Sequence, residues 1–433
     1  MPADLLAPDF SEVPYWIADL PSFKTTDATL PREVDVAVVG GGFAGLSAAL
    51  SLARSGKHVA ILEARTIGAG AAARAAGSLS HVPKASLTDL TERYGESAAH
   101  SVYREARQAR EYVETLIRDF QIECGLRSSW RFVAAHSHRA FERQTKSLPN
   151  LQESWGDVEL IERNDLHSVI GSDAFYGGIK IPQSATLQPA LLQRGLADAA
   201  LTAGAELFQN TPVISIERKG GLFSISTNAE TITANDVILA TNAETNIDNS
   251  MIKKLRERLI PVPAFALATE EVSVETMSRV LPINGPVSDT YKIINYIAPN
   301  ETGRRFILSG RAGRSDGDLR SKARRMFGYF HDRFPGLRDV RVSHCWTGKF
   351  AITADWVPHV GVAEGIHYVL GCCGTGIPMS TYLGHKVAEM LLDRARGLTV
   401  FDRPLPSLPF MGLGAPLLPL AVRGYEFRDR FFR

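Results

Sequence analysis

A glycine-rich turn near the start of the chain combines residue types and spacing that suit a phosphate-bearing cofactor. Gly40, Gly42 and Gly45 fit the pattern G-x-G-x-x-G. In this pattern the first glycine allows a tight turn, the second lets a pyrophosphate approach the backbone, and the third lets a helix pack close to a strand. Glu63 follows about 20 residues later, where a carboxylate can accept hydrogen bonds from ribose hydroxyls. Together these residues predict a dinucleotide site.

The segments around this turn have the patterns that such a site needs. Residues 35–39 predict a strand, residues 44–54 predict a helix that Gly56 ends, and residues 58–62 predict a second strand. This spacing is typical of a parallel βαβ unit. The start of the helix, at Phe43 and Ala44, would turn unpaired N–H groups and the positive end of the helix dipole toward the phosphates.

A second glycine-rich segment, near the other end of the chain, indicates which dinucleotide is bound. The first motif alone does not distinguish NAD from FAD, but Gly371, Gly374 and Gly376 come directly before a predicted helix. A flavin extends across its domain and needs a second helix N-terminus near its ring. Backbone N–H groups of Thr375 to Ile377 could stabilise the negative charge that collects on the ring during reduction. The two segments together favour FAD.

The composition is that of an ordinary globular protein of two or three domains. The 433 residues include 48 basic and 47 acidic side chains, so the net charge of +1 gives no electrostatic reason to expect nucleic acid or a membrane surface as a partner. No apolar run reaches the roughly 18 residues of a membrane span, and the N-terminal segment lacks a secretory pattern. The four cysteines show neither metal spacing nor a disulfide framework. We therefore expect no metal, buried free thiols at Cys372 and Cys373, and a reducing, cytoplasmic location.

The order of the predicted elements indicates a cofactor domain assembled from separate pieces. Residues 1–33 read as an extended lead-in, 86–120 as a charged helical region, and 189–203 as a helix that opens a second nucleotide-type stretch. Two β-rich blocks separate the nucleotide-type segments. We expect a cofactor domain formed by 34–85, 185–250 and 343–395, a substrate domain formed by 86–184 and 251–342, and a tail over 396–433 that packs on the body.

With these segments in place, the chain resembles the D-amino acid oxidase-like superfamily of FAD-dependent oxidoreductases. The matching segments, in the family's order, are GGGFAGLSAALSLARSG over 40–56, IGAGAAARAAG over 67–77, ATN over 240–242, WTGKFAITADWVPHVG over 346–361 and GCCGTGIPMSTYLG over 371–384. PYWIADLP over 14–21 and LPLAVRGYEFRDRF over 418–431 are most similar to the γ-glutamylputrescine oxidase-like amine oxidases. The resemblance implies an α/β + β fold, in which an antiparallel-sheet substrate domain is inserted into a Rossmann-like FAD domain of the glutathione-reductase type.

The resemblance also implies which further residues hold the cofactor. Besides the two glycine segments and Glu63, they are Ala64, Arg65, Gly70, Ala71, Arg74, Gly77, Ser78, Val213, Ala240, Thr241 and Gly348. The family's second flavin loop resembles G-A-S-G-R-N-G-G. Ala72 and Ala75 here lack its hydroxyl and amide, which leaves binding at that loop to the backbone and Ser78. Gly348 stands where sarcosine oxidases carry the cysteine that attaches flavin, so a non-covalent FAD is implied.

The activity that the resemblance implies is oxidation of the C–N bond of an amine or amino acid. The amine binds neutral, its α-hydrogen passes to flavin N5 as a hydride, the imine hydrolyses, and oxygen takes up the electrons to give peroxide. Lys349 and Lys292 are candidates for a cation that assists the transfer to oxygen, although each also fits an ordinary surface lysine. Tyr296 could line the substrate cavity or belong to the core. The family's Y-x-R strand reads Tyr-Ile-Ala over 296–298, so an arginine that could clasp a substrate carboxylate is missing at this point.

Two alternatives stay open at this level. A dehydrogenase of the same fold would pass electrons to a quinone or a protein, and a flavin-binding subunit would have no turnover of its own. The expected partners are a small amine or amino acid and oxygen or another electron acceptor, without nucleic acid.

Overall fold

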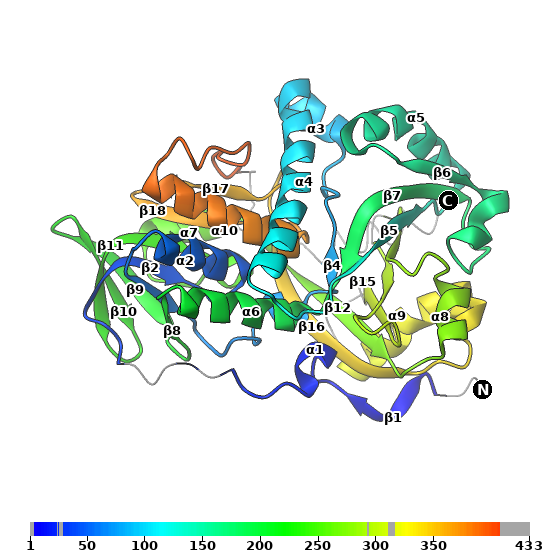
Figure 1. Cartoon of the computed structure of the whole chain (residues 1–433), viewed down its shortest axis with the longest axis horizontal. Coiled ribbons are helices and arrows are strands. Elements are labelled where there is room, and N and C mark those ends of the chain that lie inside the picture. Colours follow the sequence, from blue (N-terminus) through cyan, green and yellow to red (C-terminus); the bar gives the residue numbers. More distant parts are fainter. Residues whose placement is uncertain (1–3, 24, 26–28, 292–293, 311–316, 408–433) are drawn as a thin grey trace.

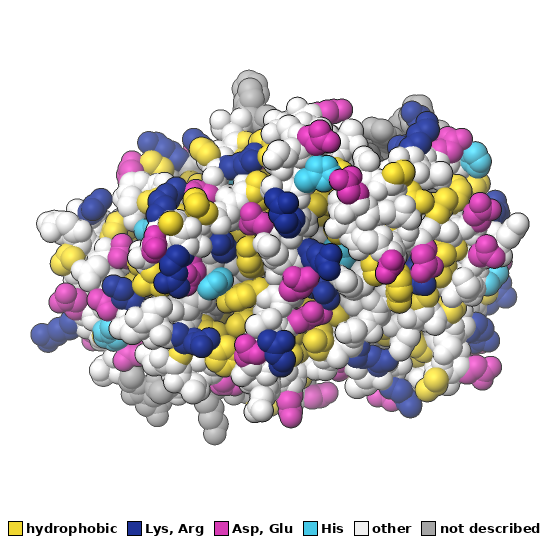
Figure 2. Space-filling model, turned by 45° about the horizontal axis from the view of Figure 1, so that its top comes forward, with side chains coloured by type: hydrophobic (Ala, Val, Ile, Leu, Met, Phe, Trp, Pro, Cys, Tyr) yellow, Lys and Arg dark blue, Asp and Glu magenta, His cyan; other side chains and the backbone are white. Residues whose placement is uncertain are grey.

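Two β-sheets form the framework of the molecule (Figure 1). The computed structural model describes residues 4–23, 25, 29–291, 294–310 and 317–407, and within these residues one sheet has eight strands and the other ten. None of the helices in this part of the chain combines the length and the apolar character that a membrane span requires. Acidic and basic side chains are interspersed on the face shown in Figure 2. Cys372 and Cys373 are buried free thiols, as predicted, and so are Cys124 and Cys345.

The eight-stranded sheet has a parallel centre. Its strands in spatial order are β17 (His359–Ala363), β18 (Ile366–Leu370), β11 (Thr231–Leu239), β2 (Glu33–Val39), β3 (Val59–Leu62) and β8 (Glu206–Phe208), with an antiparallel arm of β9 (Val213–Lys219) and β10 (Leu222–Thr227) on β11. The pairs from β18 to β8 are all parallel. All of β3 and the last residues of β2 are buried valine, alanine, leucine or isoleucine. Such continuous apolar runs are expected for parallel strands that are covered on both faces.

Three helices cover one face of this sheet, α2 (Phe43–Arg54), α6 (Pro189–Thr202) and α10 (Gly376–Leu392) (Figure 1). The β9–β10 arm and α7 (Ser250–Arg256) pack on the other face. Helix α10 crosses the first turn of α2 closely because Gly384 has no side chain. A Cβ added there would lie 2.1 Å from the carbonyl oxygen of Ala44. This contact fixes the second helix relative to the first glycine turn.

The ten-stranded sheet is mostly antiparallel. Its strands in spatial order are β1 (Leu6–Ser11), β16 (Val342–Ile352), β12 (Ile260–Thr269), β15 (Phe306–Gly310), β14 (Tyr296–Pro299), β13 (Val287–Asp289), β5 (Arg127–Ala134), β7 (Gly177–Thr186) and β4 (Ser78–Leu79), with β6 (Glu159–Glu162) on β7. Only β1–β16 and β13–β5 pair in parallel among these described strands. The sheet forms the second wall of the functional site.

The remaining helices pack around the ten-stranded sheet or between the two sheets. They are α1 (Tyr15–Ala18), α3 (Leu87–Tyr94), α4 (Glu96–Asp119), α5 (His138–Trp155), α8 (Val274–Val280) and α9 (Leu319–Arg333), with short 3₁₀ turns at Ala72–Arg74, Arg163–Ser168, Asn242–Glu244 and Pro335–Leu337. Phe327 and Phe330 of α9 share one core with Phe132 of β5. Val102 and Val113 of α4 instead share the core of α2 and α10.

Several boundaries differ from those that the sequence predicts. The lead-in is not wholly extended, because it forms β1, which pairs with β16, and α1. Strand β16 pairs with β12 along its length, so by sheet membership it belongs with the ten-stranded sheet and not with the predicted cofactor segment 343–395. Helix α4 lies on the cofactor side by its core contacts, although it falls in the segment expected for the substrate domain. The predicted tail lies outside the described residues beyond 407.

Candidate functional site

A cavity of about 760 Å³ lies between the two sheets. This volume falls in the range of small-molecule and cofactor sites, about 300–1,000 Å³. One wall comes from the eight-stranded sheet and its helices, and the other from strands β5, β12, β13, β15 and β16. The predicted cofactor residues all line this cavity except for Gly45, Gly77, Ser78 and Gly371. The sequence motifs therefore converge on one space.

The first glycine turn, between β2 and α2, has the shape of a phosphate cradle. Gly40 has a φ of +108°, and a Cβ added at Gly45 would lie 1.9 Å from the Gly40 carbonyl oxygen. These two glycines are required by the turn and by the contact between helix and strand, which explains why Gly45 does not reach the cavity. Gly42 is different, since its φ of −82° suits any residue and an added Cβ would meet no atom within 4 Å. The absence of a side chain at Gly42 leaves space open for a ligand.

Glu63 is fixed at the end of β3 with its carboxylate on the cavity. Its Oε2 accepts a hydrogen bond from the Gly41 backbone N–H at 2.8 Å, and its Oε1 accepts one from the Arg65 N–H at 3.0 Å. The Arg65 side chain pairs with Glu244 at 2.5 Å across the same rim. A carboxylate oxygen accepts more than one hydrogen bond. The Glu63 carboxylate can therefore also accept hydrogen bonds from ribose hydroxyls, as the motif predicts.

The second glycine segment lies beside the first because Asn242 holds it. The Asn242 Oδ1 accepts a hydrogen bond from the Gly371 N–H at 3.0 Å, and its Nδ2 lies 3.3 Å from the Cys372 Sγ. Gly371 has a φ of +75°, and an added Cβ would lie 2.3 Å from the Thr353 side chain, so this glycine serves packing. The start of α10, from Thr375 to Ile377, lines the cavity. A second helix N-terminus thus faces the same space as α2.

Two buried tryptophans fix the loop that lacks the family's serine and asparagine. The Trp346 Nε1–H donates to the Arg74 carbonyl at 3.0 Å, and the Trp16 Nε1–H donates to the Ala75 carbonyl at 2.8 Å. The Arg74 guanidinium itself donates to the Ala69 carbonyl at 3.1 Å and to the Thr347 carbonyl at 3.0 Å. These bonds hold the backbone of the loop against the cavity without help from the side chains at Ala72 and Ala75.

Gly77 and Ser78 lie behind this loop and not on the cavity. Gly77 has a φ of +74°, and an added Cβ would lie 2.5 Å from the Leu187 carbonyl oxygen, so close backbone packing accounts for this glycine. The Ser78 hydroxyl is buried in β4 and makes no hydrogen bond within the described residues. Ser78 is thus not placed to replace the lost side chains directly.

Comparison with known proteins agrees with this geometry. The family model described as FAD dependent oxidoreductase, DAO, matches residues 35–390. The chain belongs to this family. A gamma-glutamylputrescine oxidoreductase of Escherichia coli (strain K12) is 28% identical over 405 residues, which cover 92% of this chain and 93% of that protein. A probable oxidoreductase OrdL of Haemophilus influenzae is 27% identical over 418 residues, which cover 94% of this chain and 95% of that protein.

Among solved structures, a glycine oxidase from Geobacillus kaustophilus matches with a TM-score of 0.70 and 21% identity, covering 88% of this chain and 98% of that chain. The predicted superfamily and fold class are therefore confirmed, and this DAO-family chain is an FAD-dependent oxidoreductase. The cavity fits the cofactor, because it is open at Gly42 and faces two helix N-termini. Gln193 on its wall also carries a buried Oε1 that has no partner in the described chain, although its Nε2 donates to the Gly41 carbonyl at 2.7 Å.

The predicted catalytic candidates of the DAO-family chain lie in different places. Lys349 is exposed on the cavity wall in β16. Lys292 lies outside the described residues. Tyr296 is buried in β14 and does not line the cavity. Its hydroxyl lies near Ser78 and Arg131 without a hydrogen bond in the described chain, and burial raises its pKa to about 12.

Two charged residues of the cavity wall carry no sequence motif. Arg131 in β5 is partly buried and donates to the Ser80 Oγ at 3.2 Å and the Ser288 Oγ at 3.0 Å, and burial lowers its pKa. Asp289 in β13 is buried. Its carboxylate accepts hydrogen bonds from the Tyr329 hydroxyl at 2.6 Å and from the Asn295 Nδ2 at 2.8 Å. Burial raises the Asp289 pKa to about 6 against the effect of these bonds. Sequence reasoning missed both residues. The one signal that could have found them is a charged residue inside a segment whose pattern otherwise predicts a strand.

Asp355 serves the fold. Its carboxylate is buried and accepts hydrogen bonds from the Tyr94 hydroxyl and from the His359 Nε2 at 3.0 Å. Burial on its own would raise the pKa of Asp355, but the hydrogen bonds and charge of His359 outweigh it and lower the pKa to about 2. The next residue, Trp356, has a φ of +61° and lines the cavity. The network therefore sets the turn that carries Trp356.

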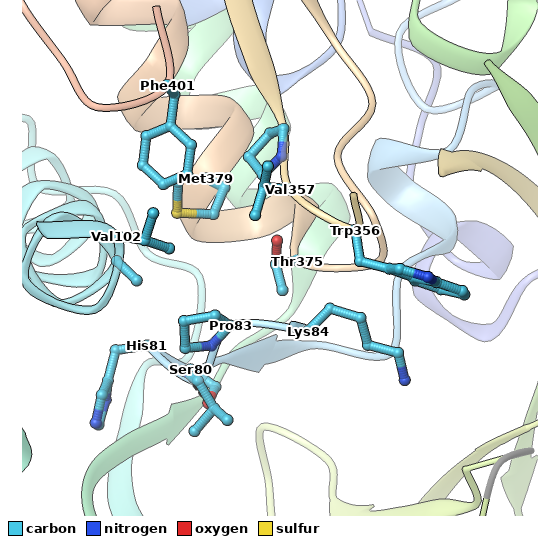
Figure 3. Close-up of a pocket in the computed structure, with 13 residues that line it drawn as sticks. Ser80, His81, Pro83, Lys84, Val102, Trp356, Val357, Thr375, Met379 and Phe401 are labelled. Carbon is cyan, nitrogen blue, oxygen red and sulfur yellow. Dashed lines mark hydrogen bonds between the residues drawn. The ribbon is translucent and has the colours of Figure 1, made fainter. Parts of the chain in front are cut away.

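A second, much smaller pocket adjoins the cavity at Thr375 (Figure 3). Lys84 and Trp356 lie on one side of Thr375, and Val102 and Met379 lie on the other. Its volume of about 10 Å³ holds at most about one water molecule. This pocket is too small for a substrate, so the large cavity is the functional site.

Proposed function

We propose that this FAD-dependent oxidoreductase oxidises the C–N bond of an amine or amino acid and passes the electrons to oxygen. The observation that carries the proposal is that the cavity does not end at the residues that suit FAD. It continues to Phe350 of β16, to Ser288 of β13 and to Ser309 of β15. This second wall leaves space for a small substrate beside the cofactor.

The names of similar proteins support the substrate class. The E. coli relative is a gamma-glutamylputrescine oxidoreductase, and glycine oxidases occur among both the relatives and the solved structures. One name refers to an amine and the other to an amino acid. We therefore place the substrate in this combined class.

The chain contributes binding and electrostatics to the reaction. FAD, when bound, supplies the acceptor for the hydride that leaves the carbon next to nitrogen. The N–H groups at the start of α10, from Thr375 to Ile377, would stabilise negative charge that collects near them. Arg131 places positive charge on the cavity wall beside the space for a substrate. Positive charge near an amine favours its neutral form, which is the form that can lose a hydride.

Lys349 is our candidate for the cation that assists oxygen. Its side chain is exposed to the cavity, so its ammonium group can stabilise negative charge that develops on oxygen as the electrons arrive. Lys292 remains a second candidate from the sequence. Tyr296 lies behind the wall, and we propose that it supports the wall without contacting the substrate.

The cofactor is proposed to be held without a covalent bond. Gly348 offers no nucleophile, and the thiols on the described cavity wall are those of Cys372 and Cys373. Burial raises the pKa of both thiols, to about 12 for Cys373. Attachment requires a thiolate, so precipitation with acid should leave the flavin in the supernatant. A yellow pellet would contradict the proposal.

The test of the function is a panel of amines and amino acids with the purified holoenzyme. Anaerobic mixing should bleach the visible flavin band with at least one compound, and air should then restore the band and produce one peroxide per turnover. Bleaching that only a dye or quinone reverses would assign the dehydrogenase alternative instead. No bleaching with any member of the panel would contradict oxidation of a C–N bond.

A further inference from the structure

We propose that Arg131 is the binding site for a carboxylate group of the substrate. The inference rests on the proposed function and narrows its substrate class to amines that carry an acid group. It concerns a position on β5, whereas the strand over 296–298 has no arginine.

The hydrogen-bond inventory of Arg131 leaves donors for a ligand. A guanidinium has five N–H donors. In the described structure one from each Nη is used, toward the hydroxyl oxygens of Ser80 and Ser288, and the Nε is buried without a partner. Each Nη therefore keeps one free N–H, and Arg131 lines the cavity. A pair of Nη donors matches the two oxygens of a carboxylate.

The charge of Arg131 is also unmatched inside the described part of the chain. Its two hydrogen-bond partners are neutral serines, and no ion pair joins it to an acid there. A buried or partly buried cation without a counter-ion is costly. The nearest acid by strand pairing is Asp289, but the Tyr329 hydroxyl and backbone N–H groups occupy its carboxylate. An anionic ligand would supply the missing charge.

The wider charge pattern of the cavity points the same way. Glu63, Arg65 and Glu244 belong to the rim of the first glycine turn, where they bond to the backbone or to one another. The other charged residues of the cavity are Arg74, Lys84, Arg131, Asp289 and Lys349. Four of these five are basic, and Arg74 holds backbone carbonyls of its own loop. On the strands of the substrate wall the charged residues are Arg131, Asp289 and Lys349, so the basic residues also outnumber the acid there, which favours an acidic ligand.

Ser288 is a positioning residue in this arrangement. It stands opposite Val133 in the parallel pair of β13 and β5, lines the cavity, and accepts a hydrogen bond from the Arg131 Nη2. Its hydroxyl hydrogen remains available to donate to the same carboxylate. Ser288→Ala should therefore weaken carboxylate binding by a smaller factor than loss of Arg131 itself.

Binding is measured on the oxidised holoenzyme with acetate and benzoate, which carry a carboxylate but no amine. Each should perturb the visible flavin spectrum, raise the melting temperature of the holoenzyme and compete with the amine or amino acid that the enzyme oxidises. In Arg131→Met both affinities should fall about 10- to 100-fold, the loss expected for charge-assisted hydrogen bonds. Arg131→Lys should recover part of the loss, because it keeps the charge but not the paired donors.

The matched control is Arg127→Met on the same strand. Arg127 does not line the cavity and donates to the Glu301 backbone carbonyl at 3.4 Å, so carboxylate affinity should stay as in the wild type. Unchanged affinity in both Arg131 variants would overturn the inference. If neither Arg131 variant retains FAD, the test is made on the wild type. It should oxidise an amino acid at least about 10-fold faster than the corresponding amide, and equal rates would overturn the inference.

These results separate the two proposals. Oxidation of amines without discrimination by Arg131 would refute only the carboxylate site. Carboxylate binding that depends on Arg131, with no flavin reduction by any amine or amino acid, would refute only the proposed function.

Discussion

Two substitutions in the first glycine turn should separate cofactor binding from folding. Gly42→Val adds a side chain at a φ of −82° where an added Cβ meets nothing within 4 Å, so the apoprotein should fold with unchanged stability. The new side chain would occupy the space of the pyrophosphate. Loss of about two charge-assisted hydrogen bonds, at about 1.5–3 kcal/mol each, would weaken FAD binding about 10²- to 10⁴-fold.

Gly45→Ala should instead destabilise the fold of the apoprotein. Its Cβ would lie 1.9 Å from the Gly40 carbonyl oxygen, so the helix must move away from the strand. Overpacking of this kind costs about 1–3 kcal/mol and should lower the melting temperature of the apoprotein by a few degrees.

The assay compares flavin absorbance per mole of purified protein with thermal unfolding of each apoprotein. Gly42→Val should be colourless and unfold at the wild-type temperature, while Gly45→Ala should unfold earlier. A Gly42→Val protein with normal flavin content would refute the assignment of this turn. Early unfolding of the Gly42→Val apoprotein would refute the reasoning from open space.

Three further predictions concern the loop, the buried acid and the cavity lysine. Trp346→Phe removes the N–H that donates to the Arg74 carbonyl, so it should lower the free energy of unfolding by about 1–3 kcal/mol and weaken flavin retention. The control Trp155→Phe removes an N–H without a partner in the described chain and should cost less when both are measured by calorimetry. Equal losses would count against the argument that Trp346 holds the loop. Asp355→Asn should lower the free energy of unfolding by about 2 kcal/mol at pH 7, because the carboxyl has a pKa of about 2 in the folded state against 3.8 when unfolded. This contribution is present above pH 4 and disappears as the pH falls toward 2. A difference between wild type and variant in urea unfolding that does not change with pH would be inconsistent with this origin. Lys349→Met should slow reoxidation by oxygen about 10-fold or more in stopped-flow absorbance and leave anaerobic reduction unchanged; an unaltered oxygen reaction would remove Lys349 from the mechanism.

The parts of the site that the sequence predicts are those that depend on local backbone geometry. Gly40 needs a positive φ, Gly45 needs close packing, and Glu63 follows at the end of the next strand. Such requirements restrict residue type within one short segment. The two glycine segments together favoured FAD, and the resemblance to the superfamily then implied the fold class.

The parts that the sequence does not predict depend on contacts between distant segments. Asn242 reaches Gly371, and Trp346 reaches Arg74, only after the sheets have formed. Arg131 gains its place on the cavity from strand pairing with β13, which no local pattern of β5 reveals.

Helix α5 and strand β16 also depend on contacts beyond their own segments. Helix α5 contains Pro149, which normally interrupts a helix, and its buried side chains, such as Leu151 and Trp155, hold it in place. Strand β16 carries motif residues that line the cofactor cavity, yet it pairs with β12 and β1 of the ten-stranded sheet, and the motif alone does not indicate this pairing.

The measurement that most directly tests the central claim is single-turnover mixing of the purified holoenzyme with an amine panel. We predict one FAD per chain, bleaching of the flavin band under anaerobic conditions by at least one amine or amino acid, and stoichiometric peroxide when oxygen is admitted. A chain that holds no FAD, or a flavin that no amine or amino acid reduces, would contradict the account.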